Sequence, residues 1–166
     1  SFDYVKDNPN EAIYYSLLLF TSIGMLLLSF AIDLLLIFVA WELMSLPTFI
    51  LAGFNKQDKL SNEGAVKFFI LGALSSGILL YGISLIFGLV GSTNLYVIGS
   101  AFESLNSNLV PLVMFATITL LAGLGLKLSI VPFHMWIPDT YQGSPTTISA
   151  LLSAATKKAG FAAAIR

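Results

Sequence analysis

Residues 12–31 read AIYYSLLLFTSIGMLLLSFA, a stretch without one charged side chain. A helix of this length extends about 30 Å, which is the thickness of the hydrocarbon core of a membrane. The rest of the chain has a similar composition, since 57% of its 166 residues are hydrophobic and only 10% are charged. A soluble domain carries about 25% charged residues. The sequence therefore predicts an all-α fold, a polytopic transmembrane helix bundle.

Polar turns on either side of this stretch divide the chain into about five spans, all within a single membrane domain at 1–166. Pro9-Asn10-Glu11 predicts the start of the first span, and Asp33 predicts a tight turn after it. The segments 55–63 and 91–108 are expected to be polar loops. The predicted spans are 12–31, 34–54, 64–90, 110–141 and 145–166.

The fourth span contains KLSIVPFHMWIP at 127–138. Its apolar stretch is too long for one straight crossing and too short for two crossings with a turn between them. Pro132 and Pro138 each lack a backbone donor and disfavour helix at the preceding residue. We therefore expect one broken helix, interrupted around Val131-Pro132. Such breaks persist at membrane depth only where protein buries them or where they line a hydrated cavity.

Basic residues in short loops indicate orientation. Lys56 and Lys59 lie in the 55–63 loop, whereas 91–108 has no Lys or Arg. We therefore expect the 55–63 loop, the amino-terminal segment and the 142–145 turn on the cytoplasmic or matrix-equivalent side. The start at Ser1 and the end inside an apolar stretch suggest an internal fragment of a longer subunit.

Several classes of site are excluded by composition. The chain has no cysteine, so it holds neither a cysteine-ligated iron–sulfur cluster nor a disulfide framework. His134 is the single histidine and cannot build a haem or zinc site by itself. No Walker A or dinucleotide-binding glycine pattern occurs. A net charge of −1 shows no basic stripe for nucleic acid. We expect no cofactor and no metal in this chain.

Charged residues inside the apolar spans are the candidate functional residues. At 1.5 Å per residue, Glu42, Lys127 and Lys157 lie at roughly one depth near mid-membrane. Each costs at least about 2.5–3.5 kcal/mol at a helix centre. Glutamate and lysine exchange protons readily, whereas arginine hardly does, so this pattern favours a proton relay. A structural ion pair or snorkelling lysines remain as alternatives, and snorkelling suits Lys67 best because it lies near a helix start.

Other residues near these charges allow two interpretations. His134 beside the break is either a proton waypoint or a structural histidine. Lys157 and Lys158 point about 100° apart on a helix, so only one faces a shared cavity. Trp41 and Trp136 are expected to be packing or interfacial anchors.

Three segments resemble a known family: WELMSLPTFILAGF (41–54), SNEGAVKFFILGALSSGILLYGISLIFGLVGSTNL (61–95) and GLKLSIVPFHMWIPDTYQGSPTTISALLSAATKKAGF (125–161). They are similar to the N subunit of proton-pumping NADH:quinone oxidoreductase, respiratory complex I, which is an antiporter-like membrane subunit. The resemblance covers about 40–166 nearly continuously. It implies a longer subunit, of which this chain carries the fourth to eighth helices.

The resemblance also assigns roles. Glu42 matches the family's fifth-helix glutamate, and Lys67 matches the lysine that tunes this glutamate. Lys127 matches the central proton carrier. Lys157 matches the lysine that connects this carrier to the next part of the proton route. Counting 1.5 Å per residue from the predicted ends of the spans places Lys67 about 10 Å shallower in the membrane than Glu42. Either the third span starts deeper than predicted, or the pairing of Lys67 with Glu42 is indirect.

The resemblance further implies an H⁺-translocating NADH:quinone oxidoreductase whose NADH, FMN, iron–sulfur clusters and quinone lie on partner subunits. The implied partners are the other membrane subunits of complex I and the lipid bilayer, without nucleic acid. The implied location is an integral position in a bacterial or archaeal cell membrane, rather than the inner mitochondrial or thylakoid membrane.

Other functions share parts of this pattern. A subunit of a multisubunit cation/proton antiporter, or of a related ferredoxin- or deazaflavin-dependent complex, would have the same architecture. A stand-alone solute transporter also uses broken helices for its substrate site. An inert membrane scaffold would need none of the buried charges.

Overall fold

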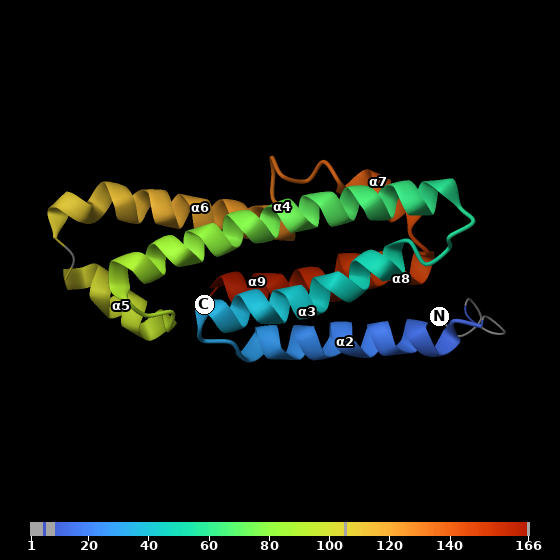
Figure 1. The fold of residues 1–166 in the computed structure, drawn as a ribbon, viewed down its shortest axis with the longest axis horizontal. Helices are drawn as coiled ribbons and strands as arrows, with labels where there is room; N and C mark the ends of the chain where they lie inside the picture. The colour runs from blue at the N-terminus through green and yellow to red at the C-terminus, as the bar shows by residue number, and fades with distance from the viewer. Residues whose placement is uncertain (1–4, 6–8, 105, 166) are drawn as a thin grey trace.

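The computed structural model describes residues 5, 9–104 and 106–165 of the chain, and their regular structure is helical apart from one isolated bridge between Asp33 and Asn94. Figure 1 shows long helices lying side by side along one axis. The elements are α2 (Glu11–Phe30), α3 (Leu34–Ala52), α4 (Lys59–Val90), α5 (Leu95–Ser104), a 3-10 turn (Ser107–Leu109), α6 (Val110–Leu128), α7 (Ile137–Gly143), α8 (Thr146–Leu151), a π turn (Leu152–Thr156) and α9 (Lys157–Ile165).

Four of the described segments are long and apolar enough to cross a membrane: α2, α3, α4 and Ser107–Leu128, which joins the 3-10 turn to α6. This confirms the prediction of an all-α, polytopic bundle. The expected span at 145–166 is built differently, as a run of α8, the π turn and α9 in which each piece is short. The π turn divides this run just before Lys157.

Two helix starts follow from acidic caps. The Asp33 carboxylate accepts hydrogen bonds from the backbone N–H groups of Leu35 and Leu36, at 2.9 and 3.3 Å, and α3 begins at the next residue. Asp58 accepts from the N–H of Leu60 at 3.0 Å, so α4 begins at Lys59. The prediction that this span starts at 64 was therefore wrong by more than one turn, because Asp58 caps a helix and residues 59–63 belong to it.

The segment 91–108 is also not a simple loop. The Asn94 side chain accepts from the N–H groups of Tyr96 and Val97, at 3.0 and 3.4 Å, and so starts α5. Ile98 on α5 is buried in the core. The N–H of Leu34 bonds to the Thr93 carbonyl at 2.8 Å, and the N–H of Leu95 bonds to the Ile32 carbonyl at 3.0 Å. These bonds join the α2–α3 and α4–α5 connections at this end of the bundle.

Small residues bring α4 and α6 into close contact. A Cβ atom added at Gly82 would lie 2.7 Å from the backbone nitrogen of Leu120, and one added at Gly123 would lie 2.6 Å from the Cα of Leu79. These distances leave no room for a side chain at either glycine. This agrees with the expectation that small residues allow membrane helices to approach closely.

The break in the fourth span separates α6 from α7. Helix α6 ends at Leu128, and Ser129 follows with a φ of 61° in the left-handed region. The N–H of Ile130 then bonds to the Gly125 carbonyl at 2.9 Å. The Val131-Pro132 peptide bond is cis. Residues 129–136 leave the helical path before α7 resumes it, as the orange loop in Figure 1 shows.

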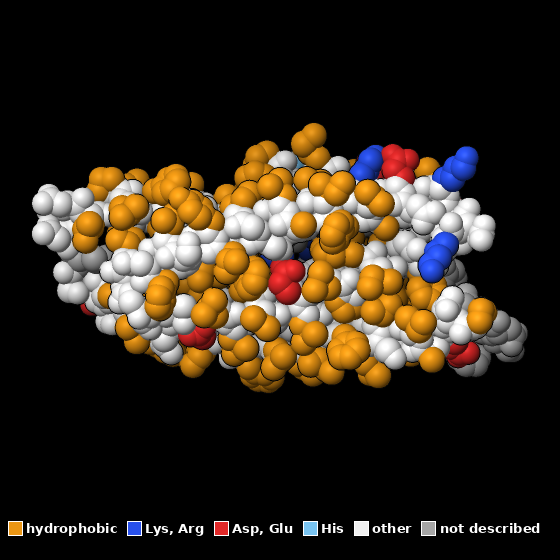
Figure 2. All heavy atoms as spheres, viewed as in Figure 1, with side chains coloured by type: hydrophobic (Ala, Val, Ile, Leu, Met, Phe, Trp, Pro, Cys, Tyr) orange, Lys and Arg blue, Asp and Glu red, His pale blue; other side chains and the backbone are white. Residues whose placement is uncertain are grey.

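The three connections predicted for the cytoplasmic side lie at one end of the bundle in Figure 1: the start of α2, the α3–α4 connection and the α7–α8 connection. On the face shown in Figure 2, the outermost blue side chains also lie at that end. Hydrophobic side chains cover much of the length between the two ends. The exposed cationic side chains of this face thus gather at one end of the bundle.

Candidate functional site

A buried ion pair lies at the centre of the bundle. Lys127 on α6 donates from Nζ to Oε1 of Glu42 on α3 at 2.7 Å. The Lys127 side chain is 4% exposed and the Glu42 side chain 22%. Removing two such charges from water is costly, and the pair persists only because each charge has partners. The sequence placed both residues at one depth, and the structure brings their charged atoms together.

A serine completes this ion pair. The Ser76 hydroxyl on α4 donates to Oε1 of Glu42 at 2.6 Å and accepts from Nζ of Lys127 at 2.8 Å. The carbonyl oxygen of Gly72 lies 2.9 Å away as a second acceptor for the same proton. Glu42, Ser76 and Lys127 therefore form a closed triangle, contributed by three different helices. We call it the Glu–Ser–Lys triangle.

Lys157 lies next to the triangle and is held by neutral groups. Its Nζ donates to the backbone carbonyl of Lys127 at 3.2 Å and to the Ser129 hydroxyl. It also lies over the Trp136 ring, 4.5 Å from the ring centroid. Within the described residues, no carboxylate lies within ion-pair distance of Lys157. Lys158, in contrast, is exposed. Of the two neighbouring lysines, Lys157 is therefore the one that faces the site.

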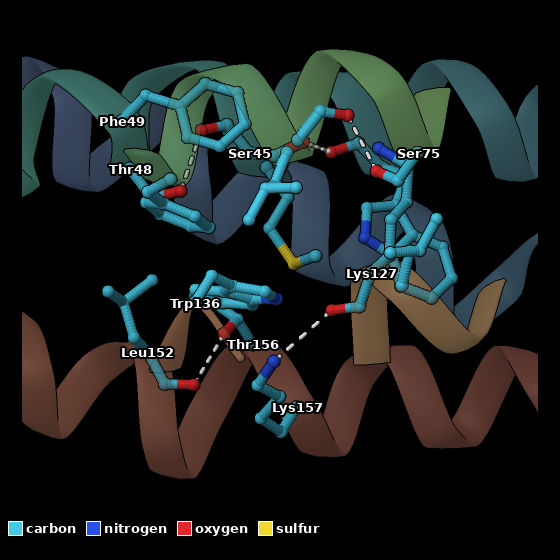
Figure 3. A pocket seen from close by; sticks show the side chains of 15 residues that line it. Ser45, Thr48, Phe49, Ser75, Lys127, Trp136, Leu152, Thr156 and Lys157 are labelled. Carbon is cyan, nitrogen blue, oxygen red and sulfur yellow. Dashed lines mark hydrogen bonds between the residues drawn. The ribbon is translucent and has the colours of Figure 1, made fainter. Parts of the chain in front are cut away.

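A cavity of about 40 Å³ lies beside Lys127 and Lys157 and is lined by both polar and apolar side chains. One buried water needs about 10–15 Å³ of such space, so the cavity has room for a few waters. Figure 3 shows Lys127, Lys157 and Trp136 around it, with the dashed bond from Lys157 to the Lys127 carbonyl. Hydroxyls at Ser45, Ser75 and Thr156 also line it. Both lysines thus border a space that can hold water.

Lys67 lies apart from the triangle. Its Nζ pairs with Glu63 Oε1 at 2.6 Å and with Asp139 Oδ2 at 2.7 Å, and its side chain is 44% exposed. Lys67 thus reaches Glu63 on its own helix and Asp139 on α7, and its tuning of Glu42, which the resemblance implies, stays a prediction.

His134 lies on the break, where its side chain is exposed. Its recorded contact is through the backbone, as its carbonyl accepts from the N–H of Ile137 at 3.1 Å. The structure does not bring the imidazole to the Glu–Ser–Lys triangle. Its role as a waypoint stays a prediction.

Three residues of the site were not identified from the sequence. Ser76 lies in the middle of the third predicted span, and its hydroxyl was not considered as a partner for the charged residues. Ser129 and Trp136 belong to the break, where the sequence predicts irregular backbone but not the direction of each side chain. Trp136 was interpreted as an anchor, yet its ring contacts a cation.

Comparisons with known proteins identify the family of the chain. A family model described as NADH:quinone oxidoreductase/Mrp antiporter, TM, matches residues 31–166. The chain is 46% identical, over its full length, to F(420)H(2) dehydrogenase subunit N of Methanosarcina mazei, of which it covers 33%. It is 50% identical to NADH-quinone oxidoreductase subunit N 2 of Rhizobium meliloti, over 92% of this chain and 32% of that protein.

A solved structure has the same fold. A chain of respiratory complex I from Thermus thermophilus with bound aureothin superposes with a TM-score of 0.79 at 39% identity, covering 92% of this chain and 33% of that one. The chain thus spans about a third of the length of the curated relatives it matches.

Proposed function

Because this chain belongs to the NADH:quinone oxidoreductase/Mrp antiporter transmembrane family, we propose that it forms part of a membrane-embedded, proton-translocating subunit. In this proposal protons move through Glu42, Lys127 and Lys157, while redox chemistry on other subunits supplies the free energy. The complex as a whole would be an H⁺-translocating NADH:quinone oxidoreductase. Its location would be the cell membrane of a bacterium or archaeon, as in the relatives above.

The observation that carries the proposal is the buried Lys127–Glu42 pair at 2.7 Å. Transfer of one proton from the ammonium to the carboxylate turns two charges into two neutral groups. The proton affinities of such a pair are coupled, so separating the partners changes the affinity of each. A movement that lengthens this contact would therefore drive proton release or uptake at the triangle.

Lys157 extends the route beyond the triangle. Its Nζ bonds to the carbonyl of Lys127, and the cavity beside both side chains has room for a few waters. Water bridges between polar groups are nearly as favourable as direct hydrogen bonds. A proton lost by Lys127 can thus pass to Lys157 through one or two waters.

Lys67 has a different place in this proposal. It holds Asp139 in the first turn of α7 and so fixes the second half of the broken helix. Its influence on Glu42 is therefore indirect and passes through the packing of α4 and α7. The exposed His134 stays a candidate waypoint only for protons that reach the outer side of the break.

The redox cofactors are proposed to lie on partner subunits. The chain has no cysteine and one histidine, so it lacks the ligand set of an iron–sulfur cluster. We assign NADH, FMN and quinone to partner subunits from the family resemblance. The proposed partners are the other membrane subunits of the complex. One relative is named for NADH and another for F(420)H(2), so either donor is compatible with this subunit type.

Proton pumping by reconstituted vesicles tests the proposal. Lys127→Ala and Glu42→Gln in the full-length subunit should each lower pumping about 100-fold, which is the scale of one lost acid–base group. Lys158→Ala and Glu103→Gln are matched controls, since both side chains are exposed and lie away from the triangle. Unchanged stoichiometry and turnover in the first two variants would remove the assigned roles.

A cation/proton antiporter subunit is the second candidate, because the matching family description names the Mrp antiporter beside the oxidoreductase. This function predicts transport driven by a Na⁺ or K⁺ gradient in vesicles without any electron donor. Pumping that depends on the electron donor and ignores the cation gradient would exclude it.

A further inference from the structure

Trp136 is turned inward, whereas its neighbours Val131 and Met135 in the break face out. The break places Val131 and Met135 at 74% and 81% exposure, whereas Trp136 is 6% exposed. The backbone of 129–136 therefore directs this one large ring into the bundle. An apolar span offers many ways to bury an aromatic side chain, but here the ring reaches a cation.

Helix α4 fixes the ring through two successive residues. Phe68 stacks on the Trp136 ring, with centroids 4.6 Å apart and an interplanar angle of 12°. Phe49 packs edge-on against Phe68, with centroids 4.6 Å apart. Lys67, which directly precedes Phe68 on α4, pairs with Asp139, and Asp139 lies three residues after Trp136. The indole therefore has support from packing on its ring and from an ion pair on its backbone segment.

The ring carries the Lys157 ammonium as part of a neutral cage. Nζ of Lys157 lies 4.5 Å from the indole centroid, bonds to the Lys127 carbonyl and donates to the Ser129 hydroxyl. All three groups come from the end of α6 and the break. An aromatic face attracts an ammonium through its quadrupole, most strongly where water is excluded, and has no comparable attraction for a neutral amine.

We propose that Trp136 is a positioning residue for Lys157: its ring, with the Lys127 carbonyl and the Ser129 hydroxyl, holds the protonated amine beside the Glu–Ser–Lys triangle. This inference rests on the proposed function, because it assigns the cage a task in proton transfer. The break then does more than interrupt a helix. It supplies the site where Lys157 keeps its proton until the segment moves.

The elements near Lys157 carry other titratable side chains. They are Glu11, Tyr14 and Tyr15 on α2, Glu42 on α3, Lys127 on α6, His134 in the break and Lys158 on its own helix. Of these, Lys127 borders the same cavity. The variants in the test leave every one of these groups unchanged.

The test measures the pH dependence of proton pumping in vesicles that contain the assembled complex. Trp136→Leu should move the alkaline half-maximum of pumping to lower pH by about one unit, since it removes a desolvated cation–ring contact. Trp136→Phe keeps a ring and should shift it by about half as much. Trp41→Leu is the matched control, because Trp41 is equally buried and lines the same cavity but packs near Gly160, and it should leave the half-maximum in place.

Lys157→Ala, in the same preparation, tests the proposed proton relay separately from the role of Trp136. If this variant pumps normally, the proposed relay fails. If it does not pump while Trp136→Leu has an unmoved alkaline half-maximum, only the role of Trp136 is overturned. If the Trp136→Leu complex does not assemble, Trp136→Phe decides: a shift of about half a unit supports the inference, and no shift overturns it. An equal shift in Trp41→Leu would also overturn it, because general packing would then account for the effect.

Discussion

Removing one charge of the Lys127–Glu42 pair should destabilise the protein more than removing both. Lys127→Met leaves the Glu42 carboxylate in apolar surroundings with the Ser76 hydroxyl as its remaining partner. Breaking a buried ion pair in this way costs about 3–5 kcal/mol. Glu42 is 22% exposed and can also take up a proton, so we expect the lower end, about 3 kcal/mol. Glu42→Gln should cost a similar amount through the lysine, which is only 4% exposed.

The double variant Glu42→Gln/Lys127→Met replaces the pair by neutral side chains of similar size. Neutral replacement of a buried pair is often harmless to stability, so its cost should lie about 2 kcal/mol or more below the sum of the single variants. The measurement is the thermal stability of the full-length subunit in its complex, with pumping recorded in parallel. Stability should return in the double variant while pumping does not.

Three outcomes would contradict this reasoning. Single variants within about 0.5 kcal/mol of the wild type would show that water or lipid headgroups compensate the lost charge. Strictly additive costs would show that the two side chains do not interact, contrary to the 2.7 Å contact. Recovery of pumping in the double variant would remove both residues from the proton route.

Two further predictions concern the scaffold. The hydrogen bond from Thr93 holds the pKa of the Asp33 carboxyl below its ordinary value. The Asp33 cap of α3 is therefore fully stabilising above about pH 4 and weakens as pH falls through the lowered pKa. Asp33→Asn should remove this acid sensitivity, which is measured by amide exchange of residues 31–38. Gly123→Ala should destabilise the subunit by about 1–3 kcal/mol, because its Cβ would lie 2.6 Å from the Cα of Leu79. Gly88→Ala, where the added Cβ meets open space, should leave the melting temperature unchanged or raise it.

The parts of the fold that depend on neighbours in sequence could be predicted. The apolar stretches correctly predicted α2, α3 and the later part of α4. Pro132 and Pro138 correctly predicted the break between α6 and α7. These features follow from local chemistry: a span must bury its backbone polar groups, and proline removes a donor.

The errors have a local cause as well. The start of α4 and the presence of α5 were missed because polar residues were counted as loop. In fact Asp58 and Asn94 are side-chain caps, and Lys59, Asn62 and Glu63 lie on the exposed side of the first turns of α4. Polarity alone does not distinguish a loop from a capped, exposed turn of helix.

The site could be predicted only in part, because its contacts join residues far apart in the chain. Depth along each helix placed Glu42, Lys127 and Lys157 at one level, but depth does not give rotation about the helix axis. Ser76 contacts Glu42 across 34 residues and Lys127 across 51. Such contacts depend on how α3, α4 and α6 are turned against each other, and close glycine contacts decide that rotation.

The π turn at Leu152–Thr156 has a consequence for which side chain meets the triangle. A π turn acts as one inserted residue in an α-helix, so it delays every later residue by one position. If α8 continued as a regular α-helix, each residue after the turn would be rotated by about 100° and moved by about 1.5 Å. Thr156 would then occupy the position that Lys157 has beside the Lys127 carbonyl. An offset of a single residue in helical phase thus decides whether a hydroxyl or an ammonium stands at the next step of the route.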